Sequence, residues 1–465
     1  MALSTRLLGP LLLLARGRQG LLRDRRGVTA LIFAISATVI IGCVGLGTEV
    51  GMWYLVRRQT QGVADASAIA GALAANDAVA GKSDPTIAAQ TAVDSIATTN
   101  GFTDGVSTLL GTVAVASTYF STFTPGPPST YVCTPTPPST TCPAVQVAVS
   151  EAVTPLISAL FGGKGITVGS QSVAWVQSIG PACALTLTGD LTVSSGTVTA
   201  GSCGLASNSN DSTAINITGT LIADTITSVG SYAGTPILNR PAAPFHPPTP
   251  DPYSAADTIN FGTFSGATCA GIPAPDPATG IIQLTSYEAS GEKAYCSDAV
   301  LAAGQTLQFS APGTYIFYNA SIIANAGTIQ CQFCNSASGV GISIVFLGTP
   351  TQPFPLDIGP SAVVSTINAS ASNGTFPALS GILFYGQSSS PVSISLLSNS
   401  PAPMEGAVYF PNANLSFTGN AANPSSCLSL VAATMMLIGT FALNPTGCPG
   451  FGTALAQMQG ARVVE

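Results

Sequence analysis

The stretch that decides the architecture is GVTALIFAISATVIIGCVGLGT, residues 27–48, which contains no charged side chain. Its 22 residues, if helical, rise about 33 Å, enough to cross a hydrocarbon core of about 30 Å. A cleaved signal peptide has a shorter apolar region, of about 7 to 15 residues. Charge-free runs of this length are also uncommon in soluble cores. Residues 27–48 are therefore predicted to form a transmembrane helix.

The charges on the two sides of this run predict its orientation. Six arginines and one aspartate lie in the basic arm of residues 1–26, and two more arginines follow the run. From residue 59 to the end, 18 acidic residues outnumber 5 basic ones. Because Lys and Arg concentrate on the cytoplasmic side of membranes, we expect a single-pass protein with a cytoplasmic N terminus and a periplasmic or extracellular bulk.

The composition of the whole chain excludes several classes of function. Charged residues make up 7% of the sequence, the net charge is −7 and the mean hydropathy is +0.45. A nucleic-acid-binding surface needs clustered Lys and Arg, so no nucleic-acid partner is expected. Beyond residue 180 the acids, Asp251 and Asp257 among them, are scattered along the sequence, and His246 stands alone in a proline-rich loop. We therefore expect no catalytic site, no metal and no cofactor.

The cysteines provide a separate test of whether the chain after the apolar run lies outside the cytoplasm. Cys43 lies in the apolar run, and the other ten follow it in five couples that are close in sequence: Cys133 with Cys142, Cys183 with Cys203, Cys269 with Cys296, Cys331 with Cys334, and Cys427 with Cys448. An even number of cysteines in an oxidising compartment predicts disulfides. The CQFC motif at 331–334 also fits redox or zinc sites. It lacks the helix start and the further ligands that such sites need, so a structural bridge is favoured.

Residues 49–178 predict a small α+β module that continues the membrane helix. An alanine-rich segment without proline extends the helix to about residue 80, and a second helix ends at Asn100 and Gly101, a typical C-cap pair. Strand-like runs follow at residues 109–120, 144–153 and 166–177, with a short helix expected after Thr154 and Pro155.

A fixed frame of residues accompanies the apolar run: Arg26, Gly27, Glu49, Tyr54, Arg57, Arg58 and QGVADASAIAG at 61–71. This frame resembles the N-terminal segment of TadG-like proteins of the tight adherence (Tad/Flp) pilus system, although Thr60 and Gly62 depart from the family's pattern. The resemblance implies a location in the bacterial inner membrane and partners among pilus-assembly or other envelope proteins. It also implies that Gln61 and Asp65 pack or pair with a partner near the membrane. An alanine-rich helix with a polar pair at i and i+4 is the alternative explanation of these two residues.

Residues 179–458 are predicted to form many short strands with Gly, Asn and Ser at the turns. Glycine-led strands begin at Gly313, Gly341, Gly381 and Gly406, with gaps of 28, 40 and 25 residues, in the range of solenoid repeats. The expected fold class is therefore mainly β, with a right-handed parallel β-helix after the membrane helix and the module, and a β-sandwich as the alternative. A proline-rich loop is expected at 241–252 and a tail at 459–465.

These features together predict a membrane-anchored envelope protein that supports Tad/Flp pilus assembly or surface adhesion by scaffolding and binding. Its partners would be the lipid bilayer and other envelope proteins, and it is not expected to be an enzyme. The alternative from another class is an anchored solenoid that binds or acts on a glycan. A groove with paired carboxylates would favour that alternative.

Overall fold

The computed structural model describes residues 25–80, 84–107, 112–123, 142–155, 159, 164–335, 337–350, 352–396, 404–419 and 425–463. The chain divides into two compact units, and we describe each by itself. Unit 1 comprises residues 1–176 and 461–465, and unit 2 comprises residues 177–460. Most of the N-terminal arm, Cys133 and the short helix expected after Pro155 lie outside the described residues.

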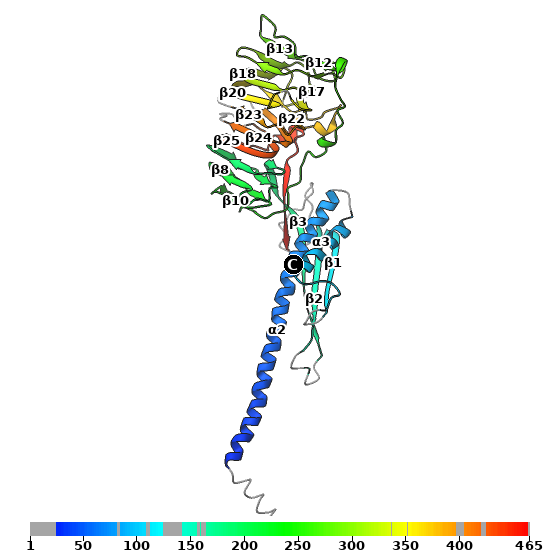
Figure 1. Cartoon of the computed structure of the whole chain (residues 1–465), viewed down its shortest axis with the longest axis vertical. Helices are drawn as coiled ribbons and strands as arrows, with labels where there is room; N and C mark the ends of the chain where they lie inside the picture. The colour runs from blue at the N-terminus through cyan, green and yellow to red at the C-terminus, as the bar shows by residue number, and fades with distance from the viewer. Residues whose placement is uncertain are drawn as a thin grey trace, which may run out of the picture. The chain divides into compact units, whose positions relative to one another are not determined.

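Unit 1 contains two helices and an antiparallel sheet (Figure 1): α2 (Arg25–Ala80), α3 (Pro85–Thr99), β1 (Val113–Phe123), β2 (Cys142–Val153) and the first part of β3 (Ile166–Thr186). The apolar run thus continues without a break into the alanine-rich segment, as one helix of 56 residues. The Asp84 carboxylate caps α3 by accepting a hydrogen bond of 2.8 Å from the Thr86 amide. Asn100 is the C-cap of α3.

Small side chains on one face of α2 let this helix lie close to α3 and the sheet. Ala64 and Ala68 are fully buried. A Cβ atom added at Gly71 would lie only 2.8 Å from Cγ2 of Val93 in α3 and 3.0 Å from Cγ1 of Val145 in β2. The alanines and the glycine of residues 61–71 are therefore explained by close packing of three elements.

Unit 2 is mainly β, and its strands pair in parallel in each of the ladders described below. In spatial order, the first ladder joins β12 (Cys269–Ala270), β14 (Ala294–Tyr295), β17 (Gly313–Tyr318), β19 (Ile342–Leu347), β22 (Ile382–Gly386), β24 (Met404–Gly419), β25 (Leu428–Gly439), the end of β3, β6 (Gly204–Ser207) and β9 (Ile226–Ser228). A second ladder joins β15 (Ala299–Leu301), β18 (Ile322–Cys331), β20 (Leu356–Val364), β23 (Val392–Leu396), β24, β25, β4 (Leu191–Val193), β7 (Ile215–Ile217) and β10 (Tyr232–Ala233).

Shorter ladders complete unit 2. One joins β13 (Ile281–Leu284), β16 (Thr306–Phe309) and the later parts of β18 and β20, and another joins β26 (Phe441–Ala442), β5 (Thr197–Ala200), β8 (Thr220–Ala223) and β11 (Ile237–Leu238). The remaining elements are β21 (Ile367–Asn368), β27 (Ala456–Val463), η2 (Ala256–Thr258), η3 (Gly266–Thr268), η4 (Pro377–Leu379) and η5 (Cys448–Phe451).

The spatial order of the strands differs from their order in the sequence. Ala184 of β3 lies opposite Leu205 of β6 on one side and opposite Leu430 of β25 on the other. The chain therefore runs from β3 to β11 towards one end of the stack. It starts again with β12 at the other end and returns until β25 meets β3 and β4, so the last long strand closes against the first.

The interior of unit 2 follows the two-residue alternation of strands, and its larger side chains stack from one strand to the next. The rings of Phe317 and Phe346 lie 5.5 Å apart, and those of Phe346 and Phe410 lie 6.2 Å apart. Gly386, on the strand between Phe346 and Phe410, is required there, because a Cβ atom would lie 2.5 Å from the Phe410 ring. The three phenylalanines therefore form a continuous aromatic column.

Residues 249–268, which we call the strap, cover the opposite face of the first ladder. The strap overlaps the proline-rich loop expected at 241–252. The Tyr253 ring lies 5.3 Å from that of Tyr409, the Phe261 ring lies 5.0 Å from that of Phe376, and the Phe264 ring lies 5.5 Å from that of Tyr318. The strap thus connects β11 to β12 while burying aromatic side chains against strands that are far apart in sequence.

Four disulfides lie in unit 2: Cys183–Cys203, Cys269–Cys296, Cys331–Cys334 and Cys427–Cys448. These are four of the five couples expected from proximity in the sequence. CQFC is among them as a bridge. The couple of Cys133 and Cys142 involves a residue outside the described part of the chain.

Candidate membrane anchor and juxtamembrane site

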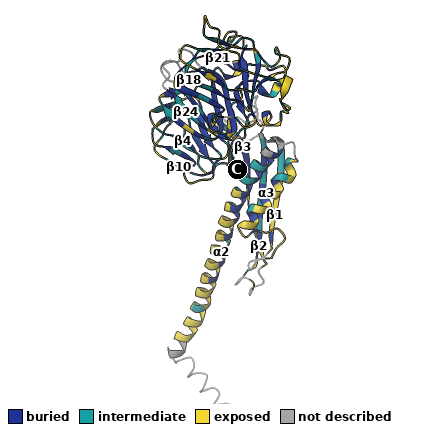
Figure 2. Cartoon of the chain, turned by 45° about the horizontal axis from the view of Figure 1, so that its top comes forward, coloured by how far each residue is buried: buried dark blue, intermediate teal, exposed yellow. Residues whose placement is uncertain are grey.

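The first half of α2 is mostly exposed (Figure 2), and the large side chains of its run 27–48 are apolar. Leu31, Phe33, Ile40 and Leu46 are 63%, 74%, 61% and 69% exposed. Within the described chain, α2 is long and apolar enough to cross a membrane between Thr29 and Asn76. Leaving this much apolar surface in water is unfavourable. The helix therefore indicates single-pass membrane anchoring.

The residues of the TadG-like frame that follow this segment lie on different sides of α2. Glu49 is buried, with 4% of its surface exposed. The Arg58 guanidinium stacks over the exposed Tyr54 ring, 5.6 Å from its centroid. The Gln61 amide donates a hydrogen bond of 2.7 Å to Oδ1 of Asp65 within the same helix. The structure thus brings Gln61 and Asp65 together, and their predicted role with a partner stays a prediction.

Thr60, which departs from the family's pattern, links α2 to β3. Its hydroxyl is fully buried, donates to the Arg57 carbonyl at 3.0 Å and lies 3.0 Å from the Ser170 hydroxyl. Ser170 in turn donates to the same carbonyl at 3.3 Å. The sequence alone gave no signal for this link, because the two hydroxyls are separated by 110 residues.

A cleft of about 380 Å³, which we call the juxtamembrane cleft, opens beside this link. Its lining comes from two elements: Val50, Trp53, Tyr54 and Arg57 of α2, and Thr167, Val168 and Gly169 of β3. Its α2 residues directly follow the exposed apolar segment. The cleft is large enough for part of a small molecule or a lipid.

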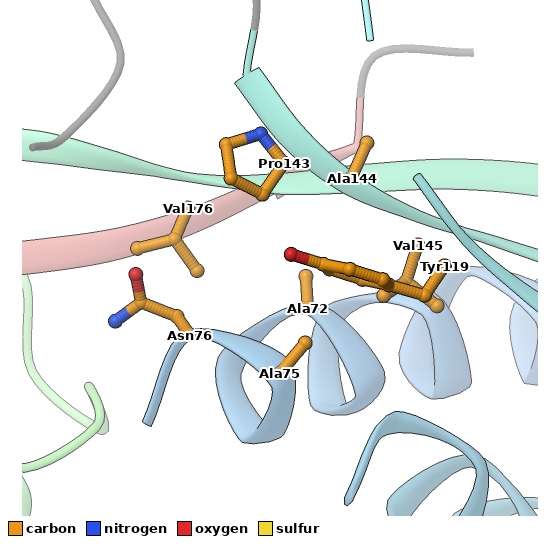
Figure 3. Close-up of a pocket in the computed structure, with 8 residues that line it drawn as sticks. All are labelled: Ala72, Ala75, Asn76, Tyr119, Pro143, Ala144, Val145 and Val176. Atoms are coloured by element: carbon orange, nitrogen blue, oxygen red, sulfur yellow. The ribbon is translucent and has the colours of Figure 1, made fainter. Parts of the chain in front are cut away.

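A second cavity of unit 1 is far smaller. It lies between α2 and the sheet, where Ala72, Ala75 and Asn76 face Tyr119 and Val145 (Figure 3). Burial raises the pKa of the Tyr119 phenol above its ordinary value. The cavity measures about 10 Å³, which is room for about one water molecule, so it is a packing defect and not a ligand site.

Unit 2 brings two of the acids that are scattered in the sequence, Asp251 and Asp257, to one phenol. The buried Tyr409 hydroxyl lies 2.8 Å from Oδ2 of Asp251 and 2.7 Å from Oδ2 of Asp257. The Tyr385 hydroxyl lies 3.2 Å from Oδ1 of Asp257. Sequence reasoning missed this group because Asp257 and Tyr409 are separated by 152 residues.

The protonation of this group follows from counting protons. A phenol has one proton, so the second short contact is a full hydrogen bond only when one acid is protonated and donates to the phenol oxygen. Burial raises the pKa of the Asp251 carboxyl, and the nearby charge of Asp257 raises it further. Of the two acids, Asp251 is therefore the one whose surroundings are shown to favour the neutral form. Both acids belong to the strap and both contact the Tyr409 hydroxyl of β24. These contacts hold the strap against the ladder.

Other polar side chains of unit 2 have structural partners. Within the described residues, no group of three or more His, Cys, Asp and Glu side chains could hold a metal ion. Nδ1 of His246 lies 3.2 Å from the Gln459 carbonyl. Arg240 forms an ion pair with Asp224.

Residues 27–76 match a family model described as Flp pilus-assembly TadE/G-like. The matched segment contains the exposed apolar half of α2 and the small residues that pack in unit 1. No curated protein and no solved structure matches the chain. The chain therefore carries a TadE/G-like segment at its membrane anchor, which supports involvement in Flp pilus assembly. A glycan ligand has no support from these comparisons.

We expect the change Tyr409→Phe to loosen the strap. It keeps the ring and removes the hydroxyl between Asp251 and Asp257. The loss of hydrogen bonds to charged groups costs about 1.5–3 kcal/mol. Hydrogen exchange of strap amides at pH 7 should become faster than in the wild type, while exchange in α3 stays unchanged.

The same variant should change the response to alkali. Burial, with the two acids, raises the Tyr409 pKa far above its ordinary value of 10. The neutral phenol thus contributes stability that is complete below pH 10 and is lost as the pH rises further. Wild-type unit 2 should therefore become less stable above pH 10, and Tyr409→Phe should show a shallower loss. Tyr385→Phe is the matched control for hydrogen exchange at pH 7, where its longer contacts to the strap predict a smaller change. Equal exchange rates in wild type and Tyr409→Phe would contradict the role of Tyr409 in holding the strap.

Proposed function

We propose that this protein is an envelope scaffold of Flp/Tad pilus assembly, anchored by α2 and acting by binding other proteins. The observation that carries the proposal is the TadE/G-like match, which spans both the exposed apolar half of α2 and the half packed against α3 and the sheet. The matched segment would thus anchor a folded module directly at the membrane. Pilus-assembly or other envelope proteins would be the partners of that module.

The orientation that we propose is a cytoplasmic N terminus with both folded units outside the cytoplasm, at the inner membrane. The arginines of residues 1–26 support it through the preference of basic residues for the cytoplasmic side. The disulfides of unit 2 also support it, because such bonds persist in oxidising compartments.

We propose that unit 2 is a right-handed parallel β-helix. The successive parallel pairs of the first and second ladders support this fold over a β-sandwich, whose sheets are antiparallel. The right hand is the general rule for crossovers between parallel strands. Irregular gaps between the glycine-led strands fit insertions of different length between turns.

One face of this proposed β-helix would serve as a binding surface. Outward residues of the second ladder lie opposite one another on successive strands: Ser393, Ser416, Met436, Thr192 and Asn216. None of these five is charged, and the next residue of the row, Asp357 of β20 opposite Ser393, adds one carboxylate. Binding there would therefore rely mainly on shape and hydrogen bonds. Catalysis on a glycan, the alternative, would need a free carboxylate pair, whereas Asp251 and Asp257 are both bonded to Tyr409. We therefore propose binding and not catalysis.

The function is tested by deleting the gene in a host that assembles Flp pili with it. We expect the pilin sheared from the cell surface to fall at least about tenfold, a clear effect against the scatter of the assay, and to return with the full chain. Alkaline phosphatase fused after Glu465 should be active, since it folds only outside the cytoplasm. Pilin secretion and pilus number unchanged by the deletion would refute the role in assembly. An inactive phosphatase fusion would refute the orientation.

A further inference from the structure

The juxtamembrane cleft has a graded lining along the axis of α2. Val50 is apolar, Trp53 and Tyr54 are aromatic, and Arg57 is cationic. From Val50 to Arg57 the helix rises about 10 Å, comparable with the headgroup layer on one side of a bilayer, about 5–8 Å thick. A phospholipid presents acyl chain, ester region and phosphate in this same order. The lining therefore matches a lipid seated upright beside the helix.

Two hydrogen-bond donors of the cleft are without partners in the described part of the chain. The indole Nε1 of Trp53 is buried and makes no hydrogen bond. No ion pair of the Arg57 guanidinium is found among the described residues. No acid lines the cleft, and the nearby Glu49 is buried and does not belong to the lining. A ligand with several acceptor oxygens and a negative charge would complement both donors.

We propose that the juxtamembrane cleft binds the phosphate headgroup of an anionic phospholipid from the surrounding leaflet. The Arg57 guanidinium pairs with the phosphate oxygens, the Trp53 indole donates a hydrogen bond, and Val50 contacts the start of an acyl chain. Thr167 of β3 also lines the cleft. This inference rests on the membrane anchoring by α2 proposed above. It adds that the anchor selects its lipid.

The full chain, reconstituted in nanodiscs of equal parts phosphatidylglycerol and phosphatidylcholine, tests the proposal. Lipids that remain bound after mild detergent release are counted by native mass spectrometry. We expect one phosphatidylglycerol per chain to be retained about tenfold over phosphatidylcholine, the ratio that one good charged pair supplies. Arg57→Gln should abolish this preference, and Arg57→Lys should restore part of it.

Arg58→Gln is the matched control, because it removes the same charge from the neighbouring residue, which stacks on Tyr54 and does not line the cleft. It should retain the preference. If Arg57→Gln and Arg58→Gln lose the phosphatidylglycerol preference equally, the lipid is attracted by net charge alone. That result would overturn the cleft as the binding site. Displacement of the lipid by 10 mM inorganic phosphate would mean a free-anion site, which also overturns the proposal. A chain that enters the nanodisc but shows no lipid preference refutes the cleft and leaves the anchor standing.

Discussion

Replacing Phe346 by alanine is expected to destabilise unit 2 by about 3–5 kcal/mol, the usual cost of removing a buried phenylalanine side chain. Phe346 is 1% exposed and lies in the aromatic column between Phe317 and Phe410. Neither neighbour can fill the space without moving its own strand, because both are held in the parallel ladder. The change removes contacts on both sides of one strand, so its effect should spread to the adjacent strands.

Hydrogen exchange under increasing denaturant measures this effect in the intact protein. Amides of β17, β19 and β24 should lose protection at a lower denaturant concentration, while α3 of unit 1 keeps its wild-type value. Phe245→Ala is the control, since Phe245 is 76% exposed and surface changes of this kind usually stay within about 0.5 kcal/mol. A loss below about 1 kcal/mol for Phe346→Ala would show that the column is not a packed core.

Local patterns of the sequence were sufficient to predict the elements of unit 1. The charge-free run and the alanine-rich extension predicted the helix now seen as α2. The Asn100–Gly101 pair predicted the end of α3. These signals are local because a helix satisfies its hydrogen bonds within a few residues. The motif at 61–71 was recognised as a pattern, but its physical reason came only from the approach of Val93 and Val145 to Gly71.

The order of the strands in unit 2 could not be predicted in this way. The pairing of Leu430 with Ala184 joins strands from opposite ends of the unit's sequence, and no periodicity marks such a closure. The glycine-led strands were expected to be successive repeats, and β17, β19, β22 and β24 are indeed neighbours in one ladder. Their gaps of 28, 40 and 25 residues gave no sign of the later pairing of β25 with β3. Insertions such as η4 lengthen some connections without changing the pairing.

The contacts of the candidate site also fall into those that the sequence predicts and those that it does not. Proximity in the sequence predicted the bridges now seen at Cys183–Cys203 and Cys427–Cys448. The link from Thr60 to Ser170 and the bonds from Tyr409 to Asp251 and Asp257 are contacts over more than 100 residues. Each uses a residue type that is common on protein surfaces, so nothing in the sequence singled it out. Contacts between residues that are close in sequence could thus be predicted, whereas contacts between residues that only the fold brings together could not.

Replacing Ile40 by aspartate is expected to prevent stable membrane insertion. Ile40 is 61% exposed near the middle of the apolar run, and a carboxylate at the centre of a membrane helix costs about 3 kcal/mol, equivalent to about a hundredfold in the insertion equilibrium. The structure offers no cation beside Ile40 among the described residues of α2, where the nearest charges are Arg26 and Glu49. The aspartate would therefore stay unpaired in lipid.

The fraction of the chain that stays in the membrane pellet after a high-salt and urea wash measures the insertion of Ile40→Asp. Val106→Asp adds the same charge at a residue of unit 1 that is 49% exposed and lies outside the helix, and Ile40→Leu changes shape without charge. Both controls should remain in the pellet, whereas Ile40→Asp should move largely to the wash. If Ile40→Asp stays in the pellet as the wild type does, the exposed apolar half of α2 is not what holds the protein in the membrane. The anchoring of the protein would then have to come from another part of the chain.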